Sequence, residues 1–168
     1  MERGKAKETE ASFPLSYALT IGLFGGIIWS VVAQLAAYFH FMTFDINAIV
    51  EYVNIPKLHS GFYKVLAGII FHTILSLIVA AAYYFFLKQS KTIWTSILFG
   101  IGVWAVFFIL LSPLFPSLPS WLEMSRDTLS TSLSLFALYG LFIGYSISYG
   151  YERHLLKEKR MNWGNANG

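Results

Sequence analysis

The stretch ASFPLSYALTIGLFGGIIWSVVAQLAAYFHFMTF, residues 11–44, runs for 34 residues without an Asp, Glu, Lys or Arg. Three more uncharged stretches follow it, at residues 65–87, 92–122 and 128–151. Only 12% of the 168 residues are charged, against the ~25% that is typical of soluble domains. Uncharged stretches of this length exclude a soluble domain, a disordered chain and a nucleic-acid-binding module.

Each uncharged stretch is long enough to cross a membrane as a helix. A hydrocarbon core of ~30 Å requires ~20 helical residues at ~1.5 Å each. The stretches are continuously apolar rather than alternating, which favours helices over a β-barrel, and the first is too long for a cleaved signal peptide. We therefore expect an all-α, four-transmembrane-helix bundle with spans near residues 16–42, 64–87, 93–111 and 129–151.

Basic residues are distributed unevenly between the two sides of this bundle. The side with both termini and the second loop has Arg3, Lys5, Lys7, Lys88, Lys91, Arg153, Lys157, Lys159 and Arg160, and the other side has Lys57, Lys64 and Arg126. Because loops rich in Lys and Arg remain in the cytoplasm, we expect both termini there, and an even number of spans agrees. The predicted organisation is an amino-terminal tail (1–15), a membrane domain (16–151) and a basic cytoplasmic carboxy-terminal tail (152–168).

The two outer loops contain further structural signals. Residues 43–63 have apolar side chains at helical spacing and predict a short helix at the outer interface, acting as a packing element or as a partner-docking surface. The prolines of residues 112–119 predict a stiff connector, with a re-entrant segment as the alternative. Ser120 and Glu123 form a capping-box pattern, which predicts that a helix restarts at Ser120.

Small residues recur at steps of four along three of the spans, and they predict the faces on which the helices pack. Helices in lipid have no hydrophobic drive to associate, so small side chains allow close approach. The helix-packing residues are Gly22, Gly26 and Ser30 in the first span, Gly68 and Ser76 in the second, and Gly140, Gly144 and Ser148 in the fourth. A pore lined by small residues is the functional alternative.

Two polar residues within these stripes, Gln34 and His72, require hydrogen-bond partners inside the bilayer. Each lies ~12 Å below the outer ends of the predicted spans, and an antiparallel hairpin would bring them level. We predict a Gln34–His72 hydrogen bond or a shared polar pocket. An ionisable residue in a membrane is a functional hypothesis by default, although a lone histidine is more often a structural hydrogen-bonder.

The chain lacks the residues that several chemistries need. It has no cysteine, which excludes thiol catalysis, disulfides and thiolate metal sites. The outer residues His40, Asp45, Glu51 and His59 are metal-ligand types, but their spacing matches no ligand signature. Nucleotide-binding and serine-hydrolase signatures are absent as well. We therefore expect no cofactor, no metal and no catalytic residue.

The order of these features resembles the YqhR family of small, uncharacterised bacterial membrane proteins. The residues behind the resemblance are the run GLFGGIIWS at positions 22–30 and the run LYGLFIGYSIS at positions 138–148. The resemblance covers nearly the whole chain. It implies a bacterial cell membrane, and it brings no established reaction, cofactor or catalytic residue with it.

Together these features favour a non-enzymatic structural or accessory membrane subunit. The alternative is a small transporter or channel component with a polar path near Gln34 and His72. The expected partners are the lipid bilayer, anionic lipid headgroups at the basic tail, and a membrane-protein partner or a second copy of the chain. Nucleic acid is not expected as a partner.

Overall fold

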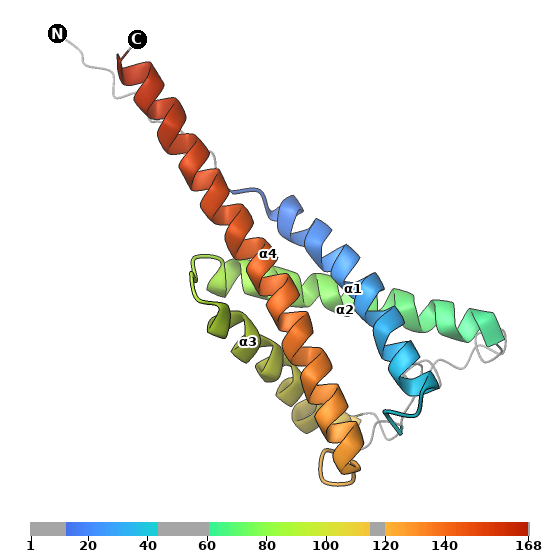
Figure 1. The fold of residues 1–168 in the computed structure, drawn as a ribbon. Helices are drawn as coiled ribbons and strands as arrows, with labels where there is room; N and C mark the ends of the chain where they lie inside the picture. The colour runs from blue at the N-terminus through green and yellow to red at the C-terminus, as the bar shows by residue number, and fades with distance from the viewer. Residues whose placement is uncertain (1–12, 44–60, 115–119, 168) are drawn as a thin grey trace.

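The computed structural model describes residues 13–43, 61–114 and 120–167, which form helices and turns with no strand among them (Figure 1). The long helices are α1 (Leu15–Tyr38), α2 (Gly61–Leu87), α3 (Ile93–Ala105) and α4 (Arg126–Asn167), and α3 continues through a π-helix η3 (Val106–Leu111) and a 3₁₀ turn η4 (Ser112–Leu114). The predicted all-α class is confirmed.

Four of these segments are long and apolar enough to cross a membrane, as the sequence predicts. They are Leu15–Tyr38, Gly61–Leu87, Ile93–Leu111 and Arg126–Trp163. Side chains such as Phe24, Ile78 and Leu98 are exposed on the outside of the bundle, where a soluble protein would place polar groups. An exterior of this kind is suited to lipid.

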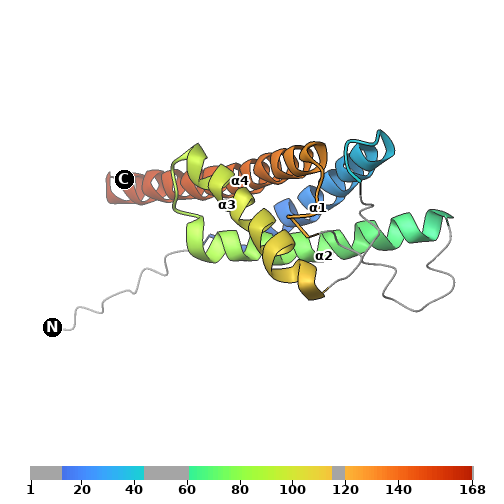
Figure 2. The same ribbon diagram turned by 90° about the horizontal axis from the view of Figure 1, so that it is seen from below.

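The helices pack as two antiparallel pairs, α1 with α2 and α3 with α4, and α4 contacts the other three helices. The start of α1 and the carboxy-terminal half of α4 lie at the same end of the molecule (Figure 1). From their connecting loop α2 and α3 diverge, and they contact each other much less than the members of each pair do (Figure 2). The bundle is therefore closed at one end and splayed further along.

The first helix is shorter than the predicted span 16–42, because it ends at Tyr38. The amide of Phe41 donates to the Ala36 carbonyl (2.9 Å) and that of His40 to the Ala37 carbonyl (3.0 Å), which is a Schellman motif. His40 occupies the left-handed position with a φ of 61°. This position is usually glycine, so the sequence contained no signal for the early end of the helix.

The fourth helix begins and ends elsewhere than predicted. Residues 120–125 form turns, with the Glu123 amide bonded to the Ser120 carbonyl (2.9 Å), so the expected restart at Ser120 is wrong. Ser125 caps the helix instead, because its hydroxyl oxygen accepts the Thr128 amide (3.2 Å). At the other end α4 runs without a break from the predicted span 129–151 through the basic tail to Asn167.

The proline-rich loop follows a change in helix type. Pro113 lacks an amide donor and its ring crowds the carbonyl four residues earlier, so a regular helix cannot continue through it. The structure has π-helical geometry over Val106–Leu111 and a 3₁₀ turn over Ser112–Leu114, which contains this proline. Of the predicted connector 112–119, the structure describes only residues 112–114. The helix predicted within 43–63 lies outside the described residues, except for residue 43 and residues 61–63.

Small residues lie where the helix backbones approach most closely. A Cβ placed on Gly100 of α3 would be 2.2 Å from the Phe136 carbonyl oxygen, and one on Gly140 of α4 would be 2.3 Å from the Gly100 Cα. Between α1 and α2, a Cβ on Gly22 would be 2.7 Å from that of Ala80, and one on Gly26 would be 2.6 Å from the Thr73 Cα. No side chain larger than hydrogen fits at these four positions.

The remaining residues of the predicted packing stripes are placed as follows. Gly144 lies against Ser96, whose Oγ would be 2.4 Å from an added Cβ. Ser30, Gly68 and Ser76 are buried, and Ser148 is half-buried beside Tyr83. The stripes thus face neighbouring helices in the described part of the chain. The sequence showed only a weak stripe in the third span, although Gly100 makes one of the closest contacts.

Candidate functional site

A cavity of about 320 Å³ lies among all four helices. Pockets that hold small molecules begin at about 300 Å³, so it is large enough for a guest. Most of its lining is aliphatic or aromatic, including Leu75, Val103 and Phe136. The lining residues that carry polar atoms are Trp29, Ser30, His72, Ser76, Ser132 and Tyr139.

The cavity opens sideways, where α2 and η3 diverge. Ile78 of α2 and Val106 of η3 both line it, and they are 62% and 50% exposed. Exposed apolar side chains on these spans face lipid, so a molecule can enter from the bilayer without crossing water. The π-helical turn of η3 supplies four of the lining residues, Val106, Phe107, Phe108 and Leu111. π-Helical segments are rare and occur frequently at functional sites.

Several polar residues of the lining lie near the middle of helices that are long enough to span a membrane. Ser76 is close to the centre of α2, which runs from Gly61 to Leu87. Trp29 belongs to the second half of α1, and Tyr139 lies more than three turns after the start of α4. Polar groups at this depth cannot reach water and must bond to each other or to the backbone.

A hydrogen-bonded chain joins three helices at one wall of the cavity. The Tyr139 hydroxyl of α4 donates to the Ser76 oxygen of α2 (2.7 Å), and the Ser76 hydroxyl donates to the Gly22 carbonyl of α1 (2.6 Å). Trp29 packs edge-on against the Tyr139 ring, with 6.4 Å between the ring centroids. The chain ties the two helix pairs together beside the open space.

His72 lines the cavity and bonds to its own helix. Its Nδ1 lies 2.9 Å from the Gly68 carbonyl oxygen. A carbonyl only accepts, so Nδ1 carries the proton, and in a neutral imidazole Nε2 is then an acceptor. The residues that line the cavity include His72 and, among those described, do not include Gln34. A direct Gln34–His72 bond stays a prediction.

Three other polar side chains of the lining bond within the protein. The Ser30 hydroxyl donates to the Gly26 carbonyl (2.5 Å), and the Ser132 hydroxyl donates to the Leu129 carbonyl (3.2 Å) while accepting Trp104 Nε1 (3.1 Å). Trp29 differs, because its Nε1 is buried with no acceptor among the described residues. Trp29 lines the cavity, but its Nε1 atom is enclosed by protein.

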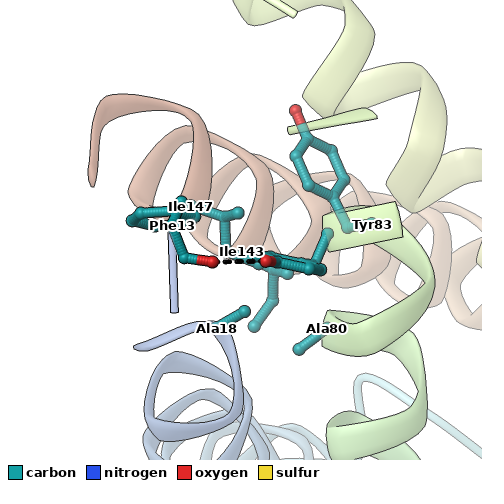
Figure 3. Packing of buried hydrophobic residues seen from close by; sticks show 7 residues of the cluster. Phe13, Ala18, Ala80, Tyr83, Ile143 and Ile147 are labelled. Atoms are coloured by element: carbon teal, nitrogen blue, oxygen red, sulfur yellow. Dashed lines mark hydrogen bonds between the residues drawn. The ribbon is translucent and has the colours of Figure 1, made fainter. Parts of the chain in front are cut away.

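At the closed end of the bundle, a buried tyrosine joins three helices. Tyr83 is 0% exposed, and its hydroxyl lies 3.1 Å from both Ser96 Oγ and Ser148 Oγ, so it joins α2, α3 and α4. Figure 3 shows Phe13, Ala18, Ala80, Ile143 and Ile147 gathered beside it.

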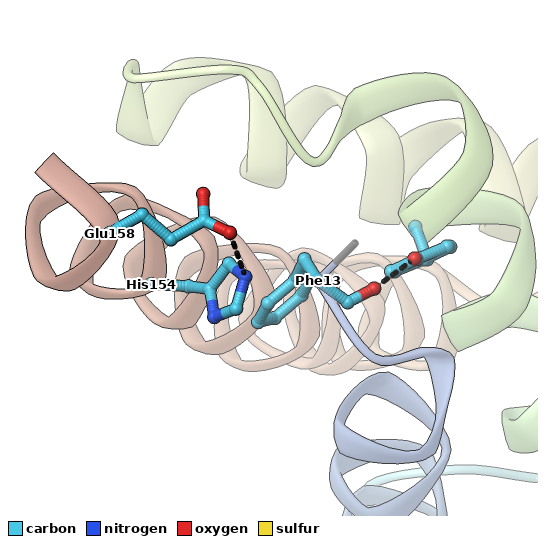
Figure 4. Close-up of polar contacts among 4 residues, drawn as sticks. Phe13, His154 and Glu158 are labelled. Atoms are coloured by element: carbon cyan, nitrogen blue, oxygen red, sulfur yellow. Dashed lines mark hydrogen bonds and ion pairs between the residues drawn. The ribbon is translucent and has the colours of Figure 1, made fainter. Parts of the chain in front are cut away.

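Phe13 fastens the start of the described chain to this end. Its carbonyl accepts a hydrogen bond from the Tyr84 hydroxyl, and its ring centroid lies 5.7 Å from that of His154 (Figure 4). The Phe13 ring centroid also lies 5.6 Å from that of Tyr151. His154 Nε2 in turn lies 3.4 Å from Glu158 of the next helical turn. The amino-terminal segment is therefore held against the carboxy-terminal part of α4.

The sequence identified part of this site. His72, Ser30 and Ser76 were predicted as polar or packing residues, and the structure places all three on the cavity. Tyr139, Trp29 and Ser132 were missed. Tyr139 and Trp29 do lie inside the two runs that resemble a known family, but nothing in the sequence distinguishes them from the other aromatic residues of the apolar spans. No cluster of metal-ligating residues occurs in the described chain, and Asp45, Glu51 and His59 lie outside it.

Comparison with known proteins agrees with the resemblance in the sequence. Residues 2–162 match the family model described as conserved membrane protein YqhR. A Bacillus subtilis protein named "Uncharacterized protein YqhR" is 35% identical over 130 residues, which cover 77% of this chain and 73% of that protein. No solved structure matches the chain. The chain therefore belongs to the YqhR family of conserved membrane proteins.

Proposed function

We propose that this protein is a non-enzymatic accessory protein of the cell membrane that binds an apolar molecule taken sideways from the bilayer. The observation that carries the proposal is the cavity of about 320 Å³, which has exposed Ile78 and Val106 at its mouth. Elsewhere in the bundle small residues bring the helix backbones into close contact, as Gly100 and Gly140 do between α3 and α4, whereas here the helices leave open space.

The chemistry of the lining supports a binding role over catalysis or ion passage. The described lining contains no Asp, Glu, Lys or Arg, and its hydroxyl groups donate to protein acceptors. An ion or a charged substrate would lose its hydration without gaining a partner. An acyl or isoprenoid chain finds aliphatic and aromatic contacts there instead.

The proposed orientation has both termini in the cytoplasm. Lys88 lies over the Tyr84 ring at 4.2 Å, and Arg153 lies 5.7 Å from the Tyr149 ring, so cations and aromatic rings meet at the closed end. Such pairs are typical of a membrane interface, and the excess of Lys and Arg is typical of the cytoplasmic one. Beyond it, Arg153, Lys157 and Arg160 of α4 share one helical face and are suited to bind anionic headgroups.

The absence of cysteine allows a direct test of orientation. Glu123→Cys places a thiol at the turn before α4, and Lys157→Cys places one on its distal part. In intact cells a membrane-impermeant maleimide is expected to label Glu123→Cys, and to label Lys157→Cys only after permeabilisation. The reverse pattern would overturn the proposed orientation.

The binding proposal is tested with a photoreactive lipid in vesicles. A phosphatidylcholine that carries a diazirine midway along one acyl chain is expected to attach to Val103 and Val106 more often than to Leu98, which lies on α3 outside the cavity lining. Val103→Phe fills the space and is expected to lower these adducts to the level at Leu98. Leu98→Phe, the matched control on the same helix, is expected to leave them unchanged.

Two results would contradict the proposal. Adducts spread evenly over cavity and lipid-facing residues would mean that no chain enters the cavity. Solute or ion flux through reconstituted vesicles that is lost in His72→Ala would favour the transporter alternative instead.

A further inference from the structure

The polar atoms that line the cavity have an imbalance between donors and acceptors. The hydroxyl protons of Ser30, Ser76, Ser132 and Tyr139 are all used in bonds to protein oxygens, at 2.5 to 3.2 Å. The one donor without an acceptor, Trp29 Nε1, is enclosed by protein atoms. None of these groups offers a proton that a guest in the cavity can reach.

Acceptor capacity remains unused among the same lining residues. His72 Nδ1 bonds to the Gly68 carbonyl at 2.9 Å and so carries the proton of a neutral imidazole, which leaves the Nε2 lone pair for another group. No described residue donates to Nε2. The hydroxyl oxygens of Ser30 and Tyr139 also keep lone pairs after donating their protons. A polar guest that fits this surface must therefore supply a proton.

We infer that the guest is a long-chain alcohol, meaning an uncharged amphiphile with a hydroxyl group on an acyl or isoprenoid chain. The inference rests on the proposed function and names the class of ligand. Its hydroxyl donates to His72 Nε2 in the cavity, and its chain lies against the aliphatic and aromatic lining towards the mouth at Ile78 and Val106. Ethers, esters and quinones carry acceptors alone and would meet only acceptors.

The mid-membrane position of the site also favours this class. Ordinary phospholipids hold their polar groups at the interface, whereas Ser76 and Tyr139 lie deep within their helices. The free-energy cost of burying a single hydroxyl at this depth is small when the hydroxyl meets an acceptor, whereas the cost of burying a charged headgroup is large. The cavity thus selects a weakly polar end group over a charged one.

The test compares two probes that differ only in the donor. Hexadecanol and hexadecyl methyl ether have the same chain, and the ether has lost the hydroxyl proton. In vesicles with wild-type protein and the photoreactive phosphatidylcholine, the alcohol is expected to suppress the adducts at Val103 at a mole fraction about threefold to tenfold lower than the ether, the worth of one hydrogen bond.

Variants at His72 check that this residue supplies the acceptor. His72→Phe keeps an aromatic ring but has no acceptor, so alcohol and ether should then suppress the adducts equally. His72→Gln retains an acceptor oxygen and should keep part of the preference. Circular dichroism and melting temperature check that both variants are folded. Because the central comparison uses wild-type protein, it stands whether or not a variant folds.

The outcomes separate this inference from the function on which it rests. If alcohol and ether suppress the adducts equally in wild-type protein, or if the ether is stronger, the inference is overturned and the cavity remains a site for chains. If neither probe suppresses adducts at Val103, the inference is overturned, whereas the proposed function fails only if adducts at Val103 do not exceed those at Leu98. If His72→Phe keeps the full preference for the alcohol, the assignment to His72 is overturned.

Discussion

The closed end of this bundle and its middle differ in how closely the helices pack. At the closed end, Tyr83 is fully buried and its hydroxyl meets serines of two other helices. In the middle, α2 and η3 diverge, and Tyr139 and Ser76 bond beside a cavity of about 320 Å³. In both regions a tyrosine hydroxyl bonds to serines, so the two regions differ in the spacing of the helix backbones around those bonds.

The contrast shows that small residues allow helices to approach closely in a membrane, whereas bulky ones occupy the space between them. Gly100 lets α3 approach α4 until the backbones touch, but one turn later Trp104 and then Phe107 and Phe108 take up the space towards η3. Phe107 and Phe108 pack towards α4, with their ring centroids 6.0 and 5.9 Å from that of Phe136, and η3 diverges from α2 on the other side of the cavity. A lateral opening results without any break in α2 or α4, which run as continuous helices past it.

The largest effect is expected where backbones touch. Gly100→Ala would place a Cβ 2.2 Å from the Phe136 carbonyl oxygen and 2.9 Å from the Gly140 Cα, so α3 and α4 must separate. We expect a loss of about 3 kcal/mol of stability, at the upper end of ordinary overpacking. The measurement is unfolding in detergent followed by circular dichroism.

Gly102→Ala is the matched control for this variant. Gly102 lies two residues further along α3, and an added Cβ there meets nothing within 4 Å. Alanine is the better helix former, so this variant should be unchanged or more stable by up to about 1 kcal/mol. Equal losses in the two variants would show that α3 and α4 are not in close contact at Gly100.

A smaller effect is expected from removing one buried hydroxyl of the closed end. Tyr83→Phe leaves Ser96 and Ser148 without the group that joins them, and we expect a loss of about 1 kcal/mol. Tyr145→Phe, on an exposed face of α4, is the control and should change stability little. If both variants melted at the wild-type temperature, the Tyr83 hydroxyl would not stabilise the closed end.

The smallest effect is a gain at the turn after α1. His40 holds a φ of 61°, which is unfavourable for any residue with a Cβ. His40→Gly relieves this cost but adds backbone freedom to the unfolded chain, so we expect a net gain of about 0.5 kcal/mol. Equilibrium unfolding measures it, with His40→Ala as a control that should show no gain. Lower stability of the glycine variant would contradict the assigned turn.

Charge patterning was sufficient to predict the four apolar spans and the all-α class of the described residues, because lipid excludes charge whatever the tertiary arrangement. The ends of α1 and α4 were beyond it: His40 in a glycine position and Ser125 as a cap become recognisable only from the backbone. The site was predicted in part. His72 stood out as polar, whereas Tyr139 joined the site only because α4 sets it opposite Ser76, a contact between residues 63 positions apart.

The central claim is that the middle of the bundle is open to lipid and closed to water. A spin label on Val103→Cys, with Leu98→Cys as the lipid-facing reference on the same helix, tests it in vesicles by collision with oxygen and with a water-soluble nickel complex. We expect the oxygen accessibility at Val103 to be close to that at Leu98, and the nickel accessibility to be low at both. Low oxygen accessibility at Val103 alone, or high nickel accessibility there, would contradict it.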